Sequence, residues 1–92
     1  MMFPVLREIC YSKQYEKELS EFDSDVKRTD EFMRGAVWTL SRNPEHGTRI
    51  AKNSRVWFLP IEDTPTATPV AVYYTFNENK VLFLSIKKVS AE

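Results

Sequence analysis

Two groups of basic residues in the second half of the chain have a spacing that could bind phosphate. Arg49, Lys52 and Arg55 recur at every third position before a strand-like segment, and Lys87 and Lys88 follow an apolar run. Cationic side chains commonly contact phosphate oxygens in nucleic acids. The same residues could instead be the solvated loop and the charged strand end that keep a sheet edge from aggregating. Both interpretations stay open for each group.

Tyr73 and Phe83 are the aromatic residues that could accompany these cations. Both fall on the more polar face of a predicted hairpin, where the alternation also places Lys87. Aromatic rings on an open sheet stack nucleic-acid bases, although cross-strand packing explains the same pair without a ligand. His46 has a side chain suited to acid/base chemistry, but an isolated loop histidine more often has a structural role. Trp38 and Trp57 are interpreted as core or partner contacts.

Composition excludes several classes of function. The 92 residues carry 13 Lys and Arg and 13 Asp and Glu, so no net charge draws the whole molecule to nucleic acid. One cysteine, Cys10, and one histidine cannot build a zinc site, and we expect no metal or cofactor. No apolar segment is long enough for a membrane span or a signal peptide. We therefore expect a cytoplasmic protein with no membrane partner, in which basic residues outnumber acidic ones in the second half.

The hydrophobic pattern predicts the elements that position these residues. Alternation at 5–10 indicates a first strand, and helical spacing indicates two helices: one capped by Ser12 that ends near 22, and one capped within 23–25 that ends near Asn43-Pro44. Three β-rich segments follow at 55–61, 70–76 and 80–86, and Asn77-Glu78-Asn79 forms the turn of a hairpin. The order β-α-α-β-β-β predicts an α+β domain with two N-terminal helices on a small antiparallel sheet.

Alternation also predicts which side chains form the core. A strict two-residue period places Val70, Val72, Tyr74 and Phe76 on the buried face together with Leu82, Leu84 and Ile86. The helices should cover this face with apolar stripes comprising Tyr15, Leu19, Phe22, Val26, Thr29, Phe32, Met33, Ala36, Val37 and Leu40. Gly35 interrupts the second helix, which suggests close packing against the sheet or the first helix.

The order and spacing of several motifs resemble the RelE/ParE toxin superfamily over nearly the whole chain. They are YSKQYEKEL in the first helix, LSRNPEHGTRI after the second, and VYYTF and VLFLSIKK in the last strands. The resemblance implies that residues 1–92 form a single toxin domain of a type II toxin–antitoxin system, with an antitoxin protein as partner. It also implies that Lys87 and Lys88 occupy the place of a catalytic cationic pair, and that Arg49, Lys52, Arg55, Tyr73 and Phe83 are candidates for RNA binding.

The resemblance leaves three functions open. The first is a ribosome-dependent mRNA interferase, a metal-independent endoribonuclease that acts on ribosome-bound mRNA. The second is a ParE-like non-nucleolytic toxin that acts on DNA gyrase, and the third is an inert interaction module of the same fold. The position of the family's third-strand arginine aligns with Ala71, and the tail VSAE contains neither arginine nor tyrosine. An active site in this chain would therefore be atypical.

Overall fold

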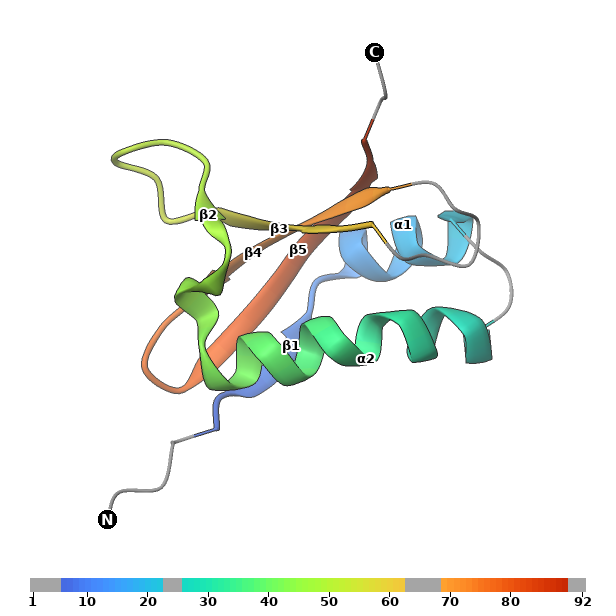
Figure 1. Cartoon of the computed structure of the whole chain (residues 1–92), viewed down its shortest axis with the longest axis horizontal. Helices are drawn as coiled ribbons and strands as arrows, with labels where there is room; N and C mark the ends of the chain where they lie inside the picture. The colour runs from blue at the N-terminus through green and yellow to red at the C-terminus, as the bar shows by residue number, and fades with distance from the viewer. Residues whose placement is uncertain (1–5, 23–25, 63–68, 90–92) are drawn as a thin grey trace.

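The computed structural model describes residues 6–22, 26–62 and 69–89 and shows two helices against one twisted sheet (Figure 1). The elements, in chain order, are β1 (Glu8–Tyr11), α1 (Lys13–Phe22), α2 (Val26–Arg42), the 3-10 turn η1 (Pro44–His46), β2 (Thr48–Arg49), β3 (Trp57–Ile61), β4 (Val70–Phe76) and β5 (Lys80–Lys88). The predicted α+β class and element order are thus confirmed, with the short β2 and η1 as additions. The predicted caps at 23–25 lie outside the described residues.

The sheet has the strand order β1-β5-β4-β3-β2 and is mixed. The pairs from β5 to β2 are antiparallel, as predicted, whereas β1 runs parallel to β5. The wholly antiparallel sheet was therefore a wrong prediction at this one edge. Parallel neighbours require a long crossover connection, and here both helices and the other strands lie between β1 and β5 in sequence.

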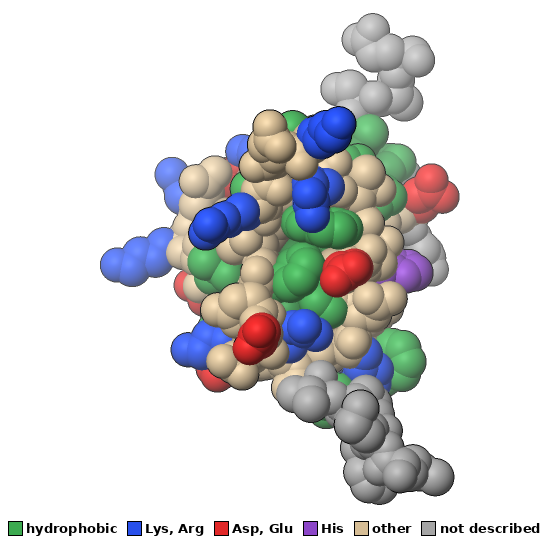
Figure 2. All heavy atoms as spheres, turned by 90° about the vertical axis from the view of Figure 1, so that its left-hand side faces the viewer, with side chains coloured by type: hydrophobic (Ala, Val, Ile, Leu, Met, Phe, Trp, Pro, Cys, Tyr) green, Lys and Arg blue, Asp and Glu red, His purple; other side chains and the backbone are tan. Residues whose placement is uncertain are grey.

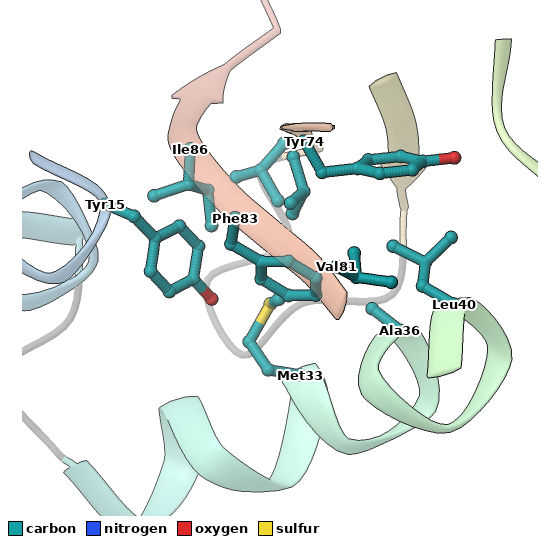
Figure 3. Close-up of a cluster of buried hydrophobic side chains, with 10 residues drawn as sticks. Tyr15, Met33, Ala36, Leu40, Tyr74, Val81, Phe83 and Ile86 are labelled. Carbon is teal, nitrogen blue, oxygen red and sulfur yellow. The ribbon is translucent and has the colours of Figure 1, made fainter. Parts of the chain in front are cut away.

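The core lies between the two helices and one face of the sheet (Figure 3). Tyr15 of α1 and Leu40 of α2 are almost fully buried and belong to the same cluster as Val72 and Tyr74 of β4. The helix stripes and the β4 pattern are therefore confirmed where they are described, except that Phe76 at the end of β4 is only partly buried. The side chains of Phe22, Val26, Thr29 and Phe32 lie outside that part. The buried hydrophobic cluster comprises Tyr15, Met33, Ala36, Leu40, Val70, Val72, Tyr74, Val81, Phe83 and Ile86.

A β-bulge in β5 overturns the prediction for that strand. Tyr73 pairs with Ser85 but Tyr74 pairs with Phe83, so Leu84 is an extra residue without a partner on β4. An extra residue reverses the alternation along the strand. Before the bulge the core residues are Val81 and Phe83, both fully buried, while Leu82 and Leu84 are only partly buried. After the bulge the predicted assignment holds, with Ile86 in the core.

Gly35 does not serve close packing inside the chain, which contradicts our prediction. The residue is exposed on α2, and a β-carbon added to it would meet no atom within 4 Å. An exposed glycine in a helix costs about 1 kcal/mol relative to alanine. Nothing within the described chain offsets that cost.

Candidate nucleic-acid interface

Arg49, Lys52 and Arg55 line one hollow of about 610 Å³ beside the end of β3. Arg49 belongs to β2 and the other two to the loop 50–56, while the rings of Trp57 and Phe76 complete the lining together with Glu45, Asn53 and Ser54. We call this the basic hollow. Cations beside aromatic rings are able to offer both phosphate contacts and a stacking surface. The structure thus brings these three residues together, and their role in RNA binding stays a prediction.

Local bonds give the basic hollow its shape. The Arg49 guanidinium lies 5.2 Å from the centre of the Trp57 ring and donates a 3.1 Å hydrogen bond to the Lys52 carbonyl oxygen. The loop closes through a 3.0 Å bond from the Ile50 N–H to the Val56 carbonyl. Because the Arg49 guanidinium makes both of these contacts, its charge is placed before any ligand arrives.

Tyr74 ties the turn before β2 to the sheet. Its buried hydroxyl donates to the Pro44 carbonyl and accepts a 3.2 Å hydrogen bond from the Gly47 N–H. Burial raises the pKa of Tyr74, and the Gly47 N–H partly opposes that rise. Glycine is required at 47, since an added β-carbon would lie 2.4 Å from the Tyr74 hydroxyl oxygen and 2.5 Å from the Phe58 carbonyl oxygen. This contact fixes where β2 and the basic hollow begin.

A second hollow, of about 430 Å³, shares Arg55 and Phe76 with the first and adds Lys80 and Cys10. Arg7 extends this surface, because its guanidinium lies 5.8 Å from the centre of the Phe76 ring and donates to the Asn77 carbonyl. Figure 2 shows this side of the molecule, with Lys and Arg side chains around a strip of hydrophobic ones and acidic side chains at its margin. The cations therefore form a track rather than a single point.

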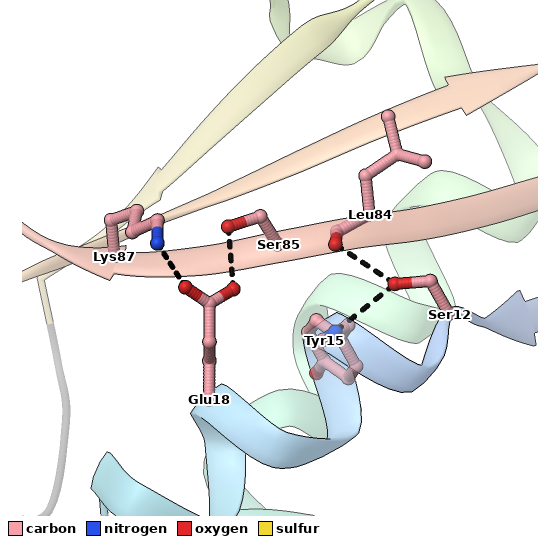
Figure 4. A network of polar contacts seen from close by, with 6 residues as sticks. All are labelled: Ser12, Tyr15, Glu18, Leu84, Ser85 and Lys87. Carbon is pink, nitrogen blue, oxygen red and sulfur yellow. Dashed lines mark hydrogen bonds and ion pairs between the residues drawn. The ribbon is translucent and has the colours of Figure 1, made fainter.

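Lys87 of β5 belongs to a different cluster, which it forms with Glu18 of α1. Its ammonium forms an ion pair with the Glu18 carboxylate, which also accepts a 2.6 Å hydrogen bond from the Ser85 hydroxyl (Figure 4). Burial raises the pKa of Glu18, but Lys87, Ser85 and the Ile86 N–H outweigh burial and hold that pKa below its usual value. In this arrangement Lys87 completes the attachment of α1 to the sheet edge.

Ser12 performs the same attachment at the start of α1. Its hydroxyl accepts a 3.0 Å hydrogen bond from the Tyr15 N–H, which confirms the predicted cap, and donates to the Leu84 carbonyl at 2.8 Å. Beyond Phe83 the strand β1 no longer covers β5. Ser12 and Glu18 therefore satisfy β5 polar groups that would otherwise form an exposed edge.

The two groups of cations lie at opposite ends of the sheet. Lys87 pairs with Ala71, whereas Phe76, at the other end of β4, lines the basic hollow. The five residue steps from Ala71 to Phe76 along β4 span about 17 Å. Lys87 and Arg55 therefore cannot contact one phosphate together, and a ligand that meets both must be several nucleotides long.

The other predicted site residues also lie outside the basic hollow. Phe83 is wholly buried between Tyr15 and the sheet, so its expected place on an open RNA-binding face is wrong. Tyr73 is half-buried on the face away from the helices, where its ring lies 6.2 Å from that of Phe58. Lys88 is exposed at the end of β5. His46 is exposed and lines neither hollow described above.

Sequence reasoning missed three residues of the site. Glu45 lines the basic hollow from η1, Phe76 forms part of its floor, and Arg7 reaches the hollow's neighbour from the far end of the chain. The alternation of residues along β4 predicted a core position for Phe76, because alternation does not indicate where the helices stop covering the sheet. A basic residue just before β1 was the only signal for Arg7.

Within the described residues, no group of three or more His, Cys, Asp and Glu side chains could hold a metal ion. No helix of that part of the chain is long and apolar enough to cross a membrane. The two hollows together present a carboxylate and several cations beside aromatic rings. Such groups can bind a phosphodiester, accept a proton from a hydroxyl and stabilise a phosphorane.

Comparison with solved structures identifies the fold. The chain superposes on a chain of the RelBE2 toxin–antitoxin complex of Mycobacterium tuberculosis with a TM-score of 0.70 and 13% identity, covering 95% of both chains. It superposes on the YoeB dimer of Staphylococcus aureus with a TM-score of 0.66 and 16% identity, covering 91% and 98%. For a chain of the chromosomal ParDE system of P. aeruginosa the values are 0.64 and 13%, with coverage of 92% and 98%.

No protein-family model matches the sequence, and no curated protein sequence does. The structural neighbours confirm the resemblance to the RelE/ParE toxins at the level of fold. At these identities a shared fold does not transfer an activity.

Proposed function

We propose that residues 1–92 are a single toxin domain of a type II toxin–antitoxin system, that the domain acts on RNA through the basic hollow, and that an antitoxin protein is its partner. The fold supports the toxin role, since the neighbours include toxin–antitoxin complexes. The observation that carries the RNA assignment is the convergence of Arg49, Lys52 and Arg55 on one hollow that the rings of Trp57 and Phe76 also line. Stacking and backbone contacts together are typical of surfaces that bind single-stranded nucleic acid.

The reaction that suits these groups is cleavage of mRNA without a metal ion, in which a 2′-oxygen of the RNA bonds to the adjacent phosphorus and the bond to the 5′-oxygen of the next nucleotide breaks. The departing 5′-oxygen takes its proton from water. Glu45 is the carboxylate that lines the basic hollow and is the candidate general base for the hydroxyl proton. Arg49 and Arg55 supply charge for the phosphorane. The molecule has no net charge to attract RNA at long range. The overall charge of the chain does not attract RNA, so a ribosome that carries the mRNA would have to bring it to the basic hollow.

A ParE-like toxin that acts by protein contact, on DNA gyrase for example, is the second candidate. The observation in its favour is the ion pair of Lys87 with Glu18, which places the residue aligned with the family's catalytic pair in a structural role. An inert interaction module of this fold would need neither site.

Induced expression in growing cells separates the three functions. Under the proposed function growth stops, and mapping of mRNA 5′ ends shows new ends within coding regions. The Lys52→Gln/Arg55→Gln variant should lose both effects, and the matched Lys13→Gln/Lys17→Gln variant on α1, with the same change in charge, should keep them. Arrest without new 5′ ends would favour the gyrase-type toxin, and unimpeded growth the inert module.

A further inference from the structure

The outer face of α2 carries a stripe of four exposed residues at helical spacing, Glu31, Gly35, Trp38 and Arg42. At 100° per residue they fall within an arc of about 60°, so they form one line along the helix. We call it the α2 stripe. Two of its members are unusual on a solvated surface: a tryptophan whose exposed fraction is 59%, and a helix-interior glycine with nothing near it. Their neighbouring positions make a projecting ring beside a notch.

Arg42 holds the Trp38 ring in place. Its guanidinium carbon lies 4.2 Å from the centre of the ring, and Nη1 donates to the Trp38 carbonyl oxygen at 3.2 Å. A stacked arginine and tryptophan pair is a frequent centre of protein interfaces. The ring is therefore presented to solvent in a fixed orientation, which lowers the entropy lost when a partner covers it.

The α2 stripe is complementary to itself when read in reverse. Positions 31 and 42, and positions 35 and 38, are symmetric about the same point between Ala36 and Val37. Two antiparallel copies of the helix, related by a two-fold axis that lies between them at the level of that point, bring each Trp38 to the other copy's Gly35 notch. They also place each Glu31 opposite the other copy's Arg42. A parallel pair would instead bring Glu31 to Glu31 and Arg42 to Arg42, which is repulsive.

We propose that the α2 stripe is a self-association surface, on which a second copy of this chain docks through an antiparallel, two-fold symmetric contact between the α2 helices. Symmetric contacts of this kind are the usual form of a homodimer. Gly35 lets the helix axes approach to about 8 Å, which the large Trp38 ring would otherwise prevent. One helix face is a small interface, so the dimer should be weak, with a Kd of about 10–100 µM.

Sedimentation velocity of the full chain, from about 1 to 500 µM, tests this contact around its expected Kd. The wild type should convert from monomer to dimer over that range. Glu31→Arg and Arg42→Glu should each weaken the dimer at least fivefold, and the double Glu31→Arg/Arg42→Glu variant should partly restore it, to a tighter dimer than either single variant forms, as interacting pairs do. Restoration is partial because Arg42→Glu also removes the guanidinium that holds the Trp38 ring. Lys13→Glu, an equal change of charge on α1, should leave the dimer unchanged.

Gly35→Ala gives a test that misfolding cannot imitate. The substitution should raise thermal stability, because alanine favours the helix and meets no atom of its own chain, yet weaken the dimer about tenfold by filling the notch. If the chain stays monomeric at the highest concentration, the proposal is wrong, and the α2 stripe would instead bind a helix of another protein. A dimer indifferent to Gly35→Ala, or one that the double charge reversal does not partly restore, overturns it equally.

Discussion

Removal of one hydroxyl, in Tyr74→Phe, should destabilise the protein by about 2 kcal/mol. The substitution keeps the buried ring but leaves the Pro44 carbonyl and the Gly47 N–H without their partner. An unsatisfied buried polar group costs roughly 1–3 kcal/mol, and a total near 2 allows for water that reaches the half-buried Gly47. For a domain of this size, 2 kcal/mol corresponds to a fall in Tm of about 8–16 °C.

Urea unfolding monitored by tryptophan fluorescence measures this change, with Tyr73→Phe as the matched control. Tyr73 is half-buried on the other face of the same strand, and no hydrogen bond of its hydroxyl is found among the described residues. The control should therefore change stability by less than about 0.5 kcal/mol. If the two variants lose equal stability, the hydroxyl of Tyr74 does not secure the turn and the reasoning fails.

The pH dependence of stability at high pH is a separate test of the Tyr74 hydroxyl. Burial raises the pKa of Tyr74 above 10.0, so the folded state favours the protonated phenol. Its contribution to stability is then complete below pH 10 and is lost as the pH rises through the folded-state pKa. Tyr74→Phe should flatten that part of the stability curve, and the same slope in both proteins would contradict the assignment.

Two further substitutions test the supports of the site and of α1. Gly47→Ala should lower stability by about 1–3 kcal/mol, because its β-carbon overlaps the Tyr74 hydroxyl and the Phe58 carbonyl. The Tm of Gly47→Ala, of Tyr74→Phe and of the double variant should show losses that are not additive. Strict additivity would argue against the overlap. Glu18→Gln should cost about 1 kcal/mol at pH 7, with the exposed Glu21→Gln as control. Because the pKa of Glu18 is lowered in the folded state, its contribution is present above pH 4.5 and is lost as the pH falls below that value, so urea curves of the two proteins should converge in acid. A constant difference down to pH 2 would be evidence against the Glu18 cluster.

Local rules predicted most of the fold. Ser12 caps α1 as its position indicated, the buried residues of α2 continue to Leu40, and β4 spans the predicted 70–76. These features depend on residues near one another in sequence. The parallel pairing of β1 with β5 was not predictable in this way, because it depends on how the crossover helices pack.

The errors at the candidate site come from pairings that the local sequence does not encode. Leu84, the bulged residue, shifts the period of β5, and so Phe83 enters the core where alternation placed it on the open face. Nothing in KVLFLSIKK distinguishes a bulge from a regular strand, since either face can be apolar. The pairing of Lys87 with Glu18 likewise joins residues 69 positions apart and leaves no local signal.

The central claim, that the basic hollow binds and cuts RNA, is tested most directly by incubating purified protein with ribosomes that carry a defined mRNA and mapping the cleavage products. Wild type and Lys13→Gln/Lys17→Gln should cut the mRNA, whereas Lys52→Gln/Arg55→Gln should lose at least tenfold in rate, or about 1.4 kcal/mol. Cutting by Lys52→Gln/Arg55→Gln at the wild-type rate would contradict the account, as would intact mRNA in every reaction.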